Sequence, residues 1–209
     1  FAAHAVDFDR DGRRDIWASI PDALGSTANY LKVSGWVAGN PWGFEVVLPA
    51  NFDFALSAPG QIKPWAQWQA LGVAQARERA LPATLGPLQL LLPAGARGPA
   101  FLASANFRAI LRYNNAVSYA LAVGHLADRL AGGSTFLKPW PGDDRALAKA
   151  DREDLQRRLV AGGFGSGAVD GVIGSGTRAA IRAFQKAKRL PEDGHPDLAL
   201  LERLRQEVQ

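Results

Sequence analysis

The stretch Val169-Asp170-Gly171-Val172-Ile173-Gly174 leads into a run in which small and apolar residues recur at helical spacing, at Thr177, Ala180, Ile181 and Phe184. Its glycines permit tight backbone turns where a side chain would clash, and an aspartate in such a turn can accept hydrogen bonds from backbone amides. The spacing after the turn predicts a helix over about 176–188. We therefore expect Asp170, Gly171, Gly174 and Phe184 to hold the local fold rather than to contact a ligand.

Two further helices flank this turn and helix. Leu155 and Leu159 fall on one face of a predicted helix over 151–161, with Asp151 as its N-cap. A third helix carries Leu198, Leu201, Leu204 and Val208, and follows the turn Gly194-His195-Pro196, where proline lies near the first helical position. Three short helices in roughly 60 residues bury a small core, so we expect marginal stability.

With Phe184-Gln185, Leu190 and Asp193-Gly194, this stretch resembles the peptidoglycan-binding domain found at the ends of many wall hydrolases. The match covers about residues 151–205, and it implies a three-helix peptidoglycan-binding domain over 151–209. In that family the ligand surface is a groove lined by turn and helix residues. The sequence does not assign the residues of that groove one by one.

The residues before this module divide into a linker and a larger block. Pro139, Pro141 and Gly142 predict a linker over about 136–150. Before it, apolar residues near one face predict a core helix over about 115–131, namely Val117, Leu121, Val123, Leu126 and Leu130. Asn114 stands at the expected N-cap of this helix, and Gly132-Gly133 ends it.

Residues 33–105 are rich in Gly and Pro and contain short apolar runs at 44–48, 88–92 and 100–102. Short apolar runs between turn signals favour strands over helices. We expect one short helix around 63–71 within this β-containing insert and another helix over 22–32 before it. The predicted fold class is α+β, mainly α.

The acidic stretch from Asp7 to Asp15 has the opening pattern of a calcium-binding EF-hand loop. Such a loop has oxygen donors at positions 1, 3, 5 and 9, which here are Asp7, Asp9, Asp11 and Asp15. It has glycine at position 6, which here is Gly12. Arg13 at position 7 would contribute its backbone carbonyl. Position 12 is Ala18 instead of Glu, and Asp22 is the next carboxylate that could close the site. The alternative is an acidic surface turn without metal. Oxygen donors in a chain without Cys do not suit zinc.

Residues 5–130 resemble the lytic transglycosylase B family, which has a lysozyme-like fold. The resemblance is carried, in this order, by Asp15-Ile16-Trp17, the run from Asp22 to Leu31, Gly35-Trp36, the run from Pro41 to Val46, the run from Asn106 to Asn115, and the run from Tyr119 to Val123. It implies a portion of a transglycosylase catalytic domain over 1–135. It also implies a structural calcium ion at Asp7, Asp9, Asp11, Arg13 and Asp22, because the family has a non-standard, longer calcium site at this place.

Enzymes of this family are lyases that cleave the β-1,4 bond between N-acetylmuramic acid and N-acetylglucosamine and release a 1,6-anhydromuramyl product. One Glu acts first as general acid and then as base, so the second carboxylate of most glycosidases is not required. That Glu lies in a helix before the acidic loop, and a chain that begins at Phe1 has no counterpart of it. Glu45, Glu78 and the glutamates of the terminal module have no evident desolvated cleft. We therefore predict that this chain alone is inactive and that its partner is the missing amino-terminal part of the same protein.

The resemblance implies that Tyr30, Tyr113, Asn114 and Tyr119 face the active site. Tyr rings stack on sugar faces, and the Asn amide can both donate to and accept from an N-acetyl group. The alternatives are that Tyr30 and Tyr119 are core aromatics and that Asn114 is only a helix cap. His4, His125 and His195 show no metal-ligand spacing.

The composition of the 209 residues limits the remaining function classes. Hydrophobic residues make up 47%, which suits a packed core. The apolar runs are too short for a transmembrane segment. The net charge of +4 suits nucleic acid, an anionic membrane, an acidic polymer or an ordinary solvated surface, and no nucleic-acid motif accompanies it. We expect peptidoglycan glycan strands as the partner and the periplasm or cell envelope of a bacterium as the location. The second candidate is a non-catalytic peptidoglycan-binding protein of the envelope.

Overall fold

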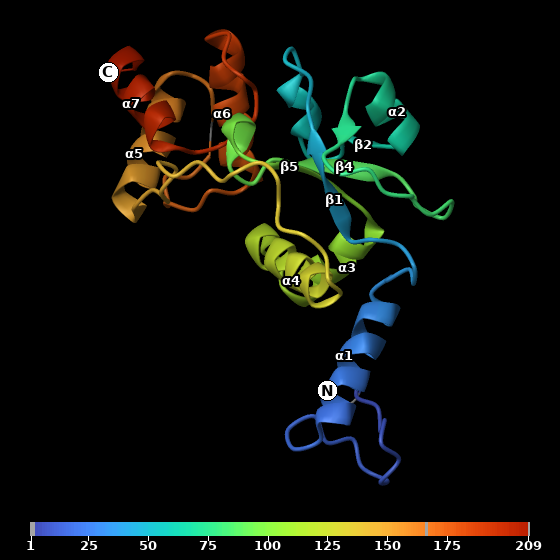
Figure 1. The fold of residues 1–209 in the computed structure, drawn as a ribbon. Coiled ribbons are helices and arrows are strands. Elements are labelled where there is room, and N and C mark those ends of the chain that lie inside the picture. The colour runs from blue at the N-terminus through green and yellow to red at the C-terminus, as the bar shows by residue number, and fades with distance from the viewer. Residues whose placement is uncertain (1–2, 166, 209) are drawn as a thin grey trace. The chain divides into compact units, whose positions relative to one another are not determined.

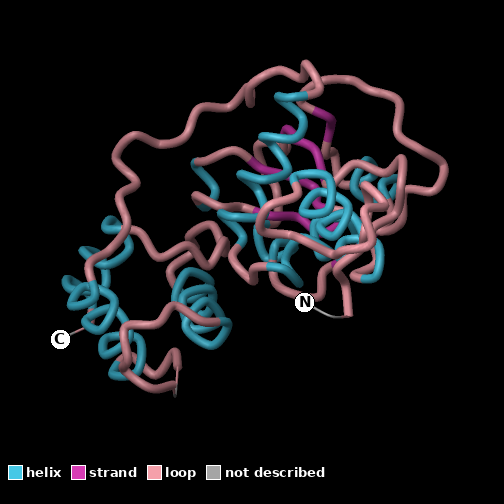
Figure 2. The backbone as a smooth tube through the Cα atoms, turned by 90° about the horizontal axis from the view of Figure 1, so that it is seen from below, coloured by secondary structure: helices cyan, strands magenta, loops and turns pink. Residues whose placement is uncertain are grey.

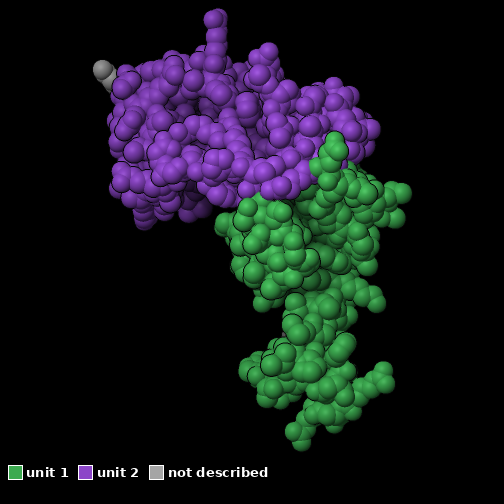
Figure 3. Space-filling model, viewed as in Figure 1, with its two compact units in different colours: residues 1–44, 78–88, 103–135 green, residues 45–77, 89–102, 136–209 purple. Residues whose placement is uncertain are grey.

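The computed structural model describes residues 3–165 and 167–208. The chain divides into two compact units, which Figure 3 draws in different colours. Unit 1 comprises residues 1–44, 78–88 and 103–135, and unit 2 comprises residues 45–77, 89–102 and 136–209. The described residues form seven α-helices and one small sheet, so the predicted α+β, mainly α class is confirmed.

Unit 1 contains the helices α1 (Ile20–Val33), α3 (Ala105–Tyr113) and α4 (Val117–Leu130), labelled in Figure 1. Ser19 caps α1 by accepting a hydrogen bond from the Asp22 amide, and Ser104 caps α3 by accepting one from the Asn106 amide. These are the standard side-chain solutions for the unpaired amides of a first turn. The helix α1 was predicted over 22–32, whereas α3 was not predicted.

The side chain of Asn106 ties α3 to the segment that follows α1. It is fully buried, and its Oδ1 accepts a hydrogen bond from the Val37 amide at 2.7 Å. Its Nδ2 donates to the carbonyls of Val37 and Asn40 at 2.9 and 2.7 Å. A buried amide with these partners avoids the desolvation cost of an unpaired polar group, so Asn106 fixes the path of the chain between α1 and β1.

Trp42 packs between α3 and α4 in the core of unit 1. Its ring lies 5.9 Å from that of Phe107, and its Nε1 donates to the Asp128 carboxylate at 2.7 Å. A Cβ atom at position 124 would meet the Trp42 ring at 2.7 Å, so only glycine fits there. This close approach brings α4 against the indole ring.

Two expectations for α4 are wrong. Asn114 is the C-cap of α3, and Ala116 is the N-cap of α4, because the helical run of 105–113 breaks just before α4 begins. The predicted core face of α4 is largely exposed in this structure: Leu121 is buried, whereas Leu130 is 82% exposed. The helix itself and its end before Gly132, which has a positive φ of 85°, are as predicted.

Most of the sheet belongs to unit 2, and its strand order is β2-β4-β5-β1-β3. The strands are β1 (Gly43–Val47), β2 (Ile62–Lys63), β3 (Ala74–Gln75), β4 (Leu88–Leu91) and β5 (Ala100–Ala103). Strands β1 and β3 are antiparallel, with Val46 opposite Gln75. The short helix α2 (Trp65–Ala70) completes the insert, together with the 3-10 helices η1 (Phe54–Ser57) and η2 (Gly95–Arg97). The three predicted strands and the helix predicted around 63–71 are confirmed.

A long loop joins α4 to the next helix and appears without regular structure in Figure 2. The Glu45 carboxylate accepts hydrogen bonds from the amides of Leu137 and Lys138, at 2.7 and 2.8 Å. The rings of Phe136 and Trp140 lie 4.7 and 6.4 Å from that of Phe101. The first part of this loop is therefore bonded to the insert.

The C-terminal module consists of α5 (Lys149–Ala161), α6 (Ser175–Ala187) and α7 (Leu198–Glu207). Its core contains the apolar residues that the periodicity predicted, with Phe184 fully buried, and it also includes Leu147 from the preceding loop. Two predicted details are wrong. Helix α5 begins two residues before Asp151, with Ala148 at its N-cap, and Asp197 rather than Pro196 marks the start of α7. The Asp197 carboxylate accepts a hydrogen bond from the Leu200 amide at 2.7 Å, which sets that boundary.

Candidate glycan-binding and cation-binding sites

The three predicted tyrosines meet on unit 1. The Tyr30 ring lies edge-on to that of Tyr113 at 5.7 Å, and the ring of Tyr113 is stacked with that of Tyr119 at 6.1 Å. The Tyr30 hydroxyl donates to the Arg112 carbonyl at 2.8 Å, which fixes its ring against α3. Tyr113 is 64% exposed and Tyr119 36% exposed, so neither is a core aromatic.

These tyrosines line one wall of an apolar pocket of about 360 Å³. The rest of its lining comes from α1, α3, α4 and the segment between α1 and β1: Thr27, Leu31, Trp36, Trp42, Ile110, Val123, Gly124 and Ala127. Aromatic faces bordering an open apolar pocket are suited to sugar rings, whose C–H faces pack on π-systems. We call this site the aromatic pocket.

Asn114 does not line the aromatic pocket. It lies beside Tyr113 at the end of α3, is exposed, and its backbone amide donates to the Ile110 carbonyl at 3.2 Å. Sequence reasoning missed Trp36 and Trp42 as pocket residues. Both stand in stretches that carry the family resemblance, Gly35-Trp36 and Pro41-Trp42, which is the signal that could have identified them.

No Asp or Glu is among the described residues that line the aromatic pocket. Glu45, three positions after the pocket residue Trp42, uses both carboxylate oxygens to accept hydrogen bonds from the amides of Leu137 and Lys138. Over its described lining, the aromatic pocket therefore presents aromatic and apolar side chains and no carboxyl group.

The acidic loop folds back on the N-terminal end of α1, as Figure 1 shows in blue. Asp7, Asp9, Asp11 and Asp22 each offer one oxygen, and these four oxygens lie within 4.8 Å of one another. The Gly12 amide donates to the Asp7 carboxylate at 3.0 Å, and the Ser19 hydroxyl donates to Asp9 at 2.7 Å. Gly12 has a φ of 89°, which makes the turn between the carboxylates.

Asp22 is the fully buried member of this cluster. Burial by itself raises the pKa of this carboxyl group, but hydrogen bonds from the amides of Phe8, Asp15 and Asp9 outweigh it and hold the pKa below the ordinary value. The amides of Phe8 and Asp15 lie 2.7 and 2.8 Å from its two oxygens. Asp22 is therefore ionised at neutral pH and organises the loop from its centre.

The donor set of the loop fits a hard divalent cation. Four carboxylates converge, one oxygen of Asp7 is buried without a hydrogen-bond partner, and no ion pair in the described residues neutralises any of the four. Calcium accepts six to eight oxygens at flexible geometry, which suits such a cluster. The amide of Arg13 donates to Asp11 at 2.8 Å, which places Arg13 within the same turn.

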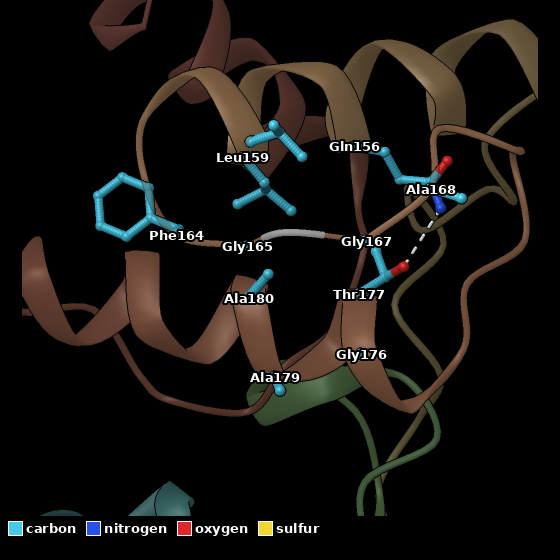
Figure 4. A pocket seen from close by; sticks show the side chains of 11 residues that line it. Gln156, Leu159, Phe164, Gly165, Gly167, Ala168, Gly176, Thr177, Ala179 and Ala180 are labelled. Carbon is cyan, nitrogen blue, oxygen red and sulfur yellow. Dashed lines mark hydrogen bonds between the residues drawn. The ribbon is translucent and has the colours of Figure 1, made fainter.

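A second pocket, of about 370 Å³, lies in the C-terminal module (Figure 4). Leu159 and Phe164 line it from α5 and the turn after α5, and Ala179 and Ala180 line it from α6. Glycine and alanine residues make up most of the remaining wall: Gly165, Gly167, Ala168 and Gly176. The groove between α5 and α6 is thus apolar, with the backbone close to its surface. We call it the module groove.

Gln156 holds the turn at the end of the module groove. Its Oε1 accepts the amides of Asp170 and Gly171 at 3.0 and 2.8 Å, and its Nε2 donates to the Asp170 carboxylate at 3.0 Å. This supports the prediction that Asp170 and Gly171 hold the fold. The side chain of this buried glutamine thus uses its hydrogen-bonding groups within the protein.

Two family models match the chain. The model described as "Transglycosylase SLT domain" matches residues 1–128, and the model described as "Putative peptidoglycan binding domain" matches residues 148–204. The first match covers more than half of the chain and contains the aromatic pocket and the acidic loop. The second contains the module groove.

Similar proteins agree with these matches. SltB3 from Pseudomonas aeruginosa, solved in complex with NAG-anhNAM-pentapeptide, is 55% identical with a TM-score of 0.91, over 98% of this chain and 55% of that one. Its complex with NAG-NAM-pentapeptide gives 56% identity and the same TM-score, over 97% of this chain and 55% of that one. The membrane-bound lytic murein transglycosylase B of Escherichia coli is 33% identical over 63% of this chain and 35% of its own length. The chain thus spans about half the length of the solved relatives.

Proposed function

Because the chain belongs to the transglycosylase SLT family and ends in a peptidoglycan-binding domain, we propose that it is part of a lytic transglycosylase acting on peptidoglycan. The reaction would cleave the β-1,4 bond between N-acetylmuramic acid and N-acetylglucosamine and leave a 1,6-anhydromuramyl end. The anhydromuramyl ligand of the related SltB3 supports this product. The aromatic pocket is the observation that carries the proposal, since three tyrosines from α1, α3 and α4 converge on it and two of them, Tyr113 and Tyr119, are exposed.

In this proposal the chain positions the glycan and does not itself supply the proton. Tyr30, Tyr113 and Tyr119 would stack on sugar rings, and Asn114 would hydrogen-bond an N-acetyl group from the pocket edge. Departure of a sugar alkoxide at neutral pH needs a general acid, which contributes about 10²–10⁴-fold to the rate. A phenolic hydroxyl is chemically a weaker acid than a carboxyl group and is poorly suited to this step. The acid would therefore come from a Glu in a further part of the same protein.

The exposed apolar face of α4 supports the partnership with a further part of the protein. Leu126 and Leu130 are both more than half exposed, although the helical spacing of α4 is that of a core helix. Large exposed apolar side chains on one helix face mark an interaction surface. The relatives are longer than this chain, so the missing amino-terminal part of the same protein is the proposed occupant.

We propose that the acidic loop binds one structural calcium ion through Asp7, Asp9, Asp11, Asp22 and the Arg13 carbonyl. The ion would neutralise carboxylates that repel one another and would hold the N-terminal end of α1 in place. A ligand that binds only the native state stabilises it by about 2.7 kcal/mol at 100 times its dissociation constant. Calcium should therefore raise the Tm of the protein, and a chelator should reverse the effect.

The module groove is the proposed binding site for peptidoglycan on the terminal domain. Its apolar wall of Leu159, Phe164, Ala179 and Ala180 would pack against methyl groups and sugar faces of the polymer. This gives the protein two places to hold the wall, of which only the aromatic pocket belongs to the transglycosylase portion.

The bacterial relatives act on cell wall, which supports a location in the periplasm or envelope. Among the residues that the structure describes, no helix has both the length and the apolarity needed to cross a bilayer. The second candidate is a non-catalytic peptidoglycan-binding protein, and the match of residues 148–204 to the peptidoglycan-binding domain supports it as well.

Mass spectrometry of muropeptides separates the two candidates. We expect no cleavage by residues 1–209 alone and release of anhydromuropeptides by the longest natural form of the protein. In that form, Tyr113→Ala should lower the rate strongly, whereas Val47→Ala, on an exposed strand position of unit 2, should not. Binding of sacculi by the longer form without any anhydro product would favour the non-catalytic candidate. Anhydro products from residues 1–209, lost in Glu45→Gln or Glu78→Gln, would overturn the assignment of the general acid.

A further inference from the structure

Trp42 is the one buried aromatic residue in the described lining of the aromatic pocket. It lines the pocket although only 4% of the residue is exposed, and it stands directly before β1. Its carbonyl accepts a hydrogen bond from the Ser104 amide at 2.9 Å, and its indole ring packs so closely against α4 that a Cβ atom at Gly124 would lie 2.7 Å from it. A ring this close to its neighbours fits the pocket wall only in a narrow range of orientations.

The carboxylate of Asp128 holds this indole ring from α4. Asp128 is half-buried in the last turn of the helix, and it accepts a hydrogen bond from the Trp42 Nε1 at 2.7 Å. Hydrogen bonds to carboxylates at such distances are among the stronger ones in proteins. The indole ring has this single polar atom, so the bond directs one edge of the ring toward α4. Asp128 does not itself line the aromatic pocket, so it acts on the pocket through Trp42.

The main chain of Asp128 is fixed as well. Its carbonyl accepts a hydrogen bond from the Gly133 amide at 2.8 Å, in the turn that ends α4. The neighbouring Arg129 side chain donates to the Gly133 carbonyl at 2.9 Å. The carboxylate therefore projects from a backbone with a defined position, and its bond to Trp42 joins the end of α4 to the residue before β1.

Arg79 places a positive charge in the surroundings of Asp128. Its guanidinium group lies 5.2 Å from the centre of the Phe44 ring, two residues after Trp42. Burial lowers the pKa of Arg79, and the negative charge of Asp128 opposes that shift. The carboxylate therefore balances a cation in addition to holding the indole, so a test of its role has to separate the two effects.

We infer that Asp128 is a positioning residue of the glycan site, which keeps the Trp42 indole in the orientation that a bound sugar ring meets. The inference rests on the proposed function, since it takes the aromatic pocket as the place of the glycan. A pocket wall that already has its bound arrangement loses no side-chain freedom when the ligand arrives, which raises the affinity. Loss of the bond would remove an acceptor from a buried N–H group and favour other orientations of the ring.

NMR spectroscopy of the longest natural form of the protein, labelled with isotope-enriched tryptophan, tests the inference. The probe is a tetramer of N-acetylglucosamine, which has the N-acetyl sugar rings of the glycan but lacks the bond that the proposed reaction cleaves. The Trp42 indole signal is identified by its absence from Trp42→Phe. Asp128→Leu should shift this signal and weaken the affinity for the probe roughly tenfold, whereas Asp128→Asn, which keeps an acceptor oxygen, should recover most of the affinity.

Two further variants separate positioning from charge and from stability. Asp128→Glu keeps the charge near Arg79 but moves the acceptor by one methylene group, so it should shift the Trp42 signal and weaken binding of the probe. Arg129→Gln is the matched control, because it removes a hydrogen bond from the same turn at a residue that does not line the aromatic pocket. Its affinity for the probe should stay within about twofold of the wild type.

The double variant of Trp42→Phe with Asp128→Leu should bind the probe as Trp42→Phe alone does, because the carboxylate then has no indole to hold. Additive losses in that double variant, or an unchanged affinity in Asp128→Leu while the Trp42 signal shifts, would overturn the inference and leave the proposed glycan site intact. If Asp128→Leu does not fold, the comparison of Asp128→Glu with Asp128→Asn carries the same test. Failure of the wild type to bind the probe would count against the aromatic pocket and the proposed function, and with them against the inference.

Discussion

The carboxylates of the acidic loop and those of the C-terminal module are compensated in different ways. In the loop, four carboxylates converge within 4.8 Å and accept hydrogen bonds from backbone amides and one hydroxyl. In the module, Asp154 lies between Arg158 at 3.0 Å and Arg205 at 2.8 Å. The module supplies its own positive charge, whereas the loop has no cationic side chain paired with its four carboxylates in the described part of the chain.

Asp193 of unit 2 is held by hydrogen bonds and, within the described residues, not by an ion pair, but it stands apart from clusters of carboxylates such as that of the acidic loop. Its carboxylate accepts hydrogen bonds from the Gln185 side chain at 2.7 Å and from the amides of His195 and Ala96 at 2.9 and 2.8 Å. A Cβ atom at Gly95 would lie 2.7 Å from this carboxylate, so the absence of a side chain there allows the contact. The comparison teaches that the acidic loop differs from the module in two ways: four carboxylates converge there, and none of them is paired with a cationic side chain in the described residues.

The largest effect that we expect comes from Asp22→Ala. The change removes the buried acceptor of the amides of Phe8 and Asp15 and leaves both without a partner. It should cause the greatest loss of Tm of any change described here and abolish the response of Tm to calcium, as measured by circular dichroism. Asp22→Asn, which keeps one acceptor oxygen, should lose less. A calcium response that survives in Asp22→Ala would remove this residue from the cation site.

The next effect concerns the module, where no cation is involved. Gln156→Leu keeps the side-chain volume but leaves the amides of Asp170 and Gly171 unpaired. It should lower the free energy of unfolding by about 2 kcal/mol, with the same loss in calcium and in chelator, as followed by chemical denaturation. Gln69→Leu, at an exposed position of α2, is the matched control and should have little effect. A loss that depends on calcium would contradict the separation of the two regions.

A smaller effect should appear in acid. For Asp154, burial raises the pKa, but the hydrogen bonds and charges of Arg205 and Arg158 outweigh it and leave the pKa below the ordinary value. A depressed pKa in the native state contributes stability that is present above the unfolded-state pKa and is lost as the pH falls through the native one. The module should therefore lose stability below about pH 4. Arg205→Gln should raise the Asp154 pKa in an NMR titration, and an unchanged pKa would show that Arg158 alone sets it.

The smallest effect is expected for an exposed ion pair of the same module. Lys149 and Glu153 lie 3.4 Å apart on α5, and the Lys149 side chain is 72% exposed. Solvent screens such pairs, so Lys149→Ala should change the free energy of unfolding by less than about 0.5 kcal/mol. A decrease of more than about 1 kcal/mol in the free energy of unfolding would contradict this expectation. It would show that the Lys149–Glu153 pair stabilises the module despite its exposure.

Patterns that act within a few residues could be predicted from the sequence. The helices of the module follow from apolar residues at helical spacing, and the carboxylates of the acidic loop follow from alternate positions around Gly12. The strands near 44–48, 88–92 and 100–102 were recognised for the same reason. The exact caps were not, because Ala148 and Ala116 carry no capping side chain that a pattern could reveal.

The sequence by itself thus determined the fold class, the terminal module and the acidic residues of a candidate cation loop, since these depend on local spacing and on residue type. Only the tertiary structure decided which residues from distant parts of the chain are in contact. Tyr30 reaches the Arg112 carbonyl across 82 positions of the chain, and Trp42 reaches Asp128 across 86. The Glu45 carboxylate accepts a hydrogen bond from the amide of Leu137, 92 positions away. No sequence motif indicates this partner. Contacts of this length arise from the packing of buried side chains such as Asn106 and Trp42, and a periodic pattern carries no information about which distant residue will meet them.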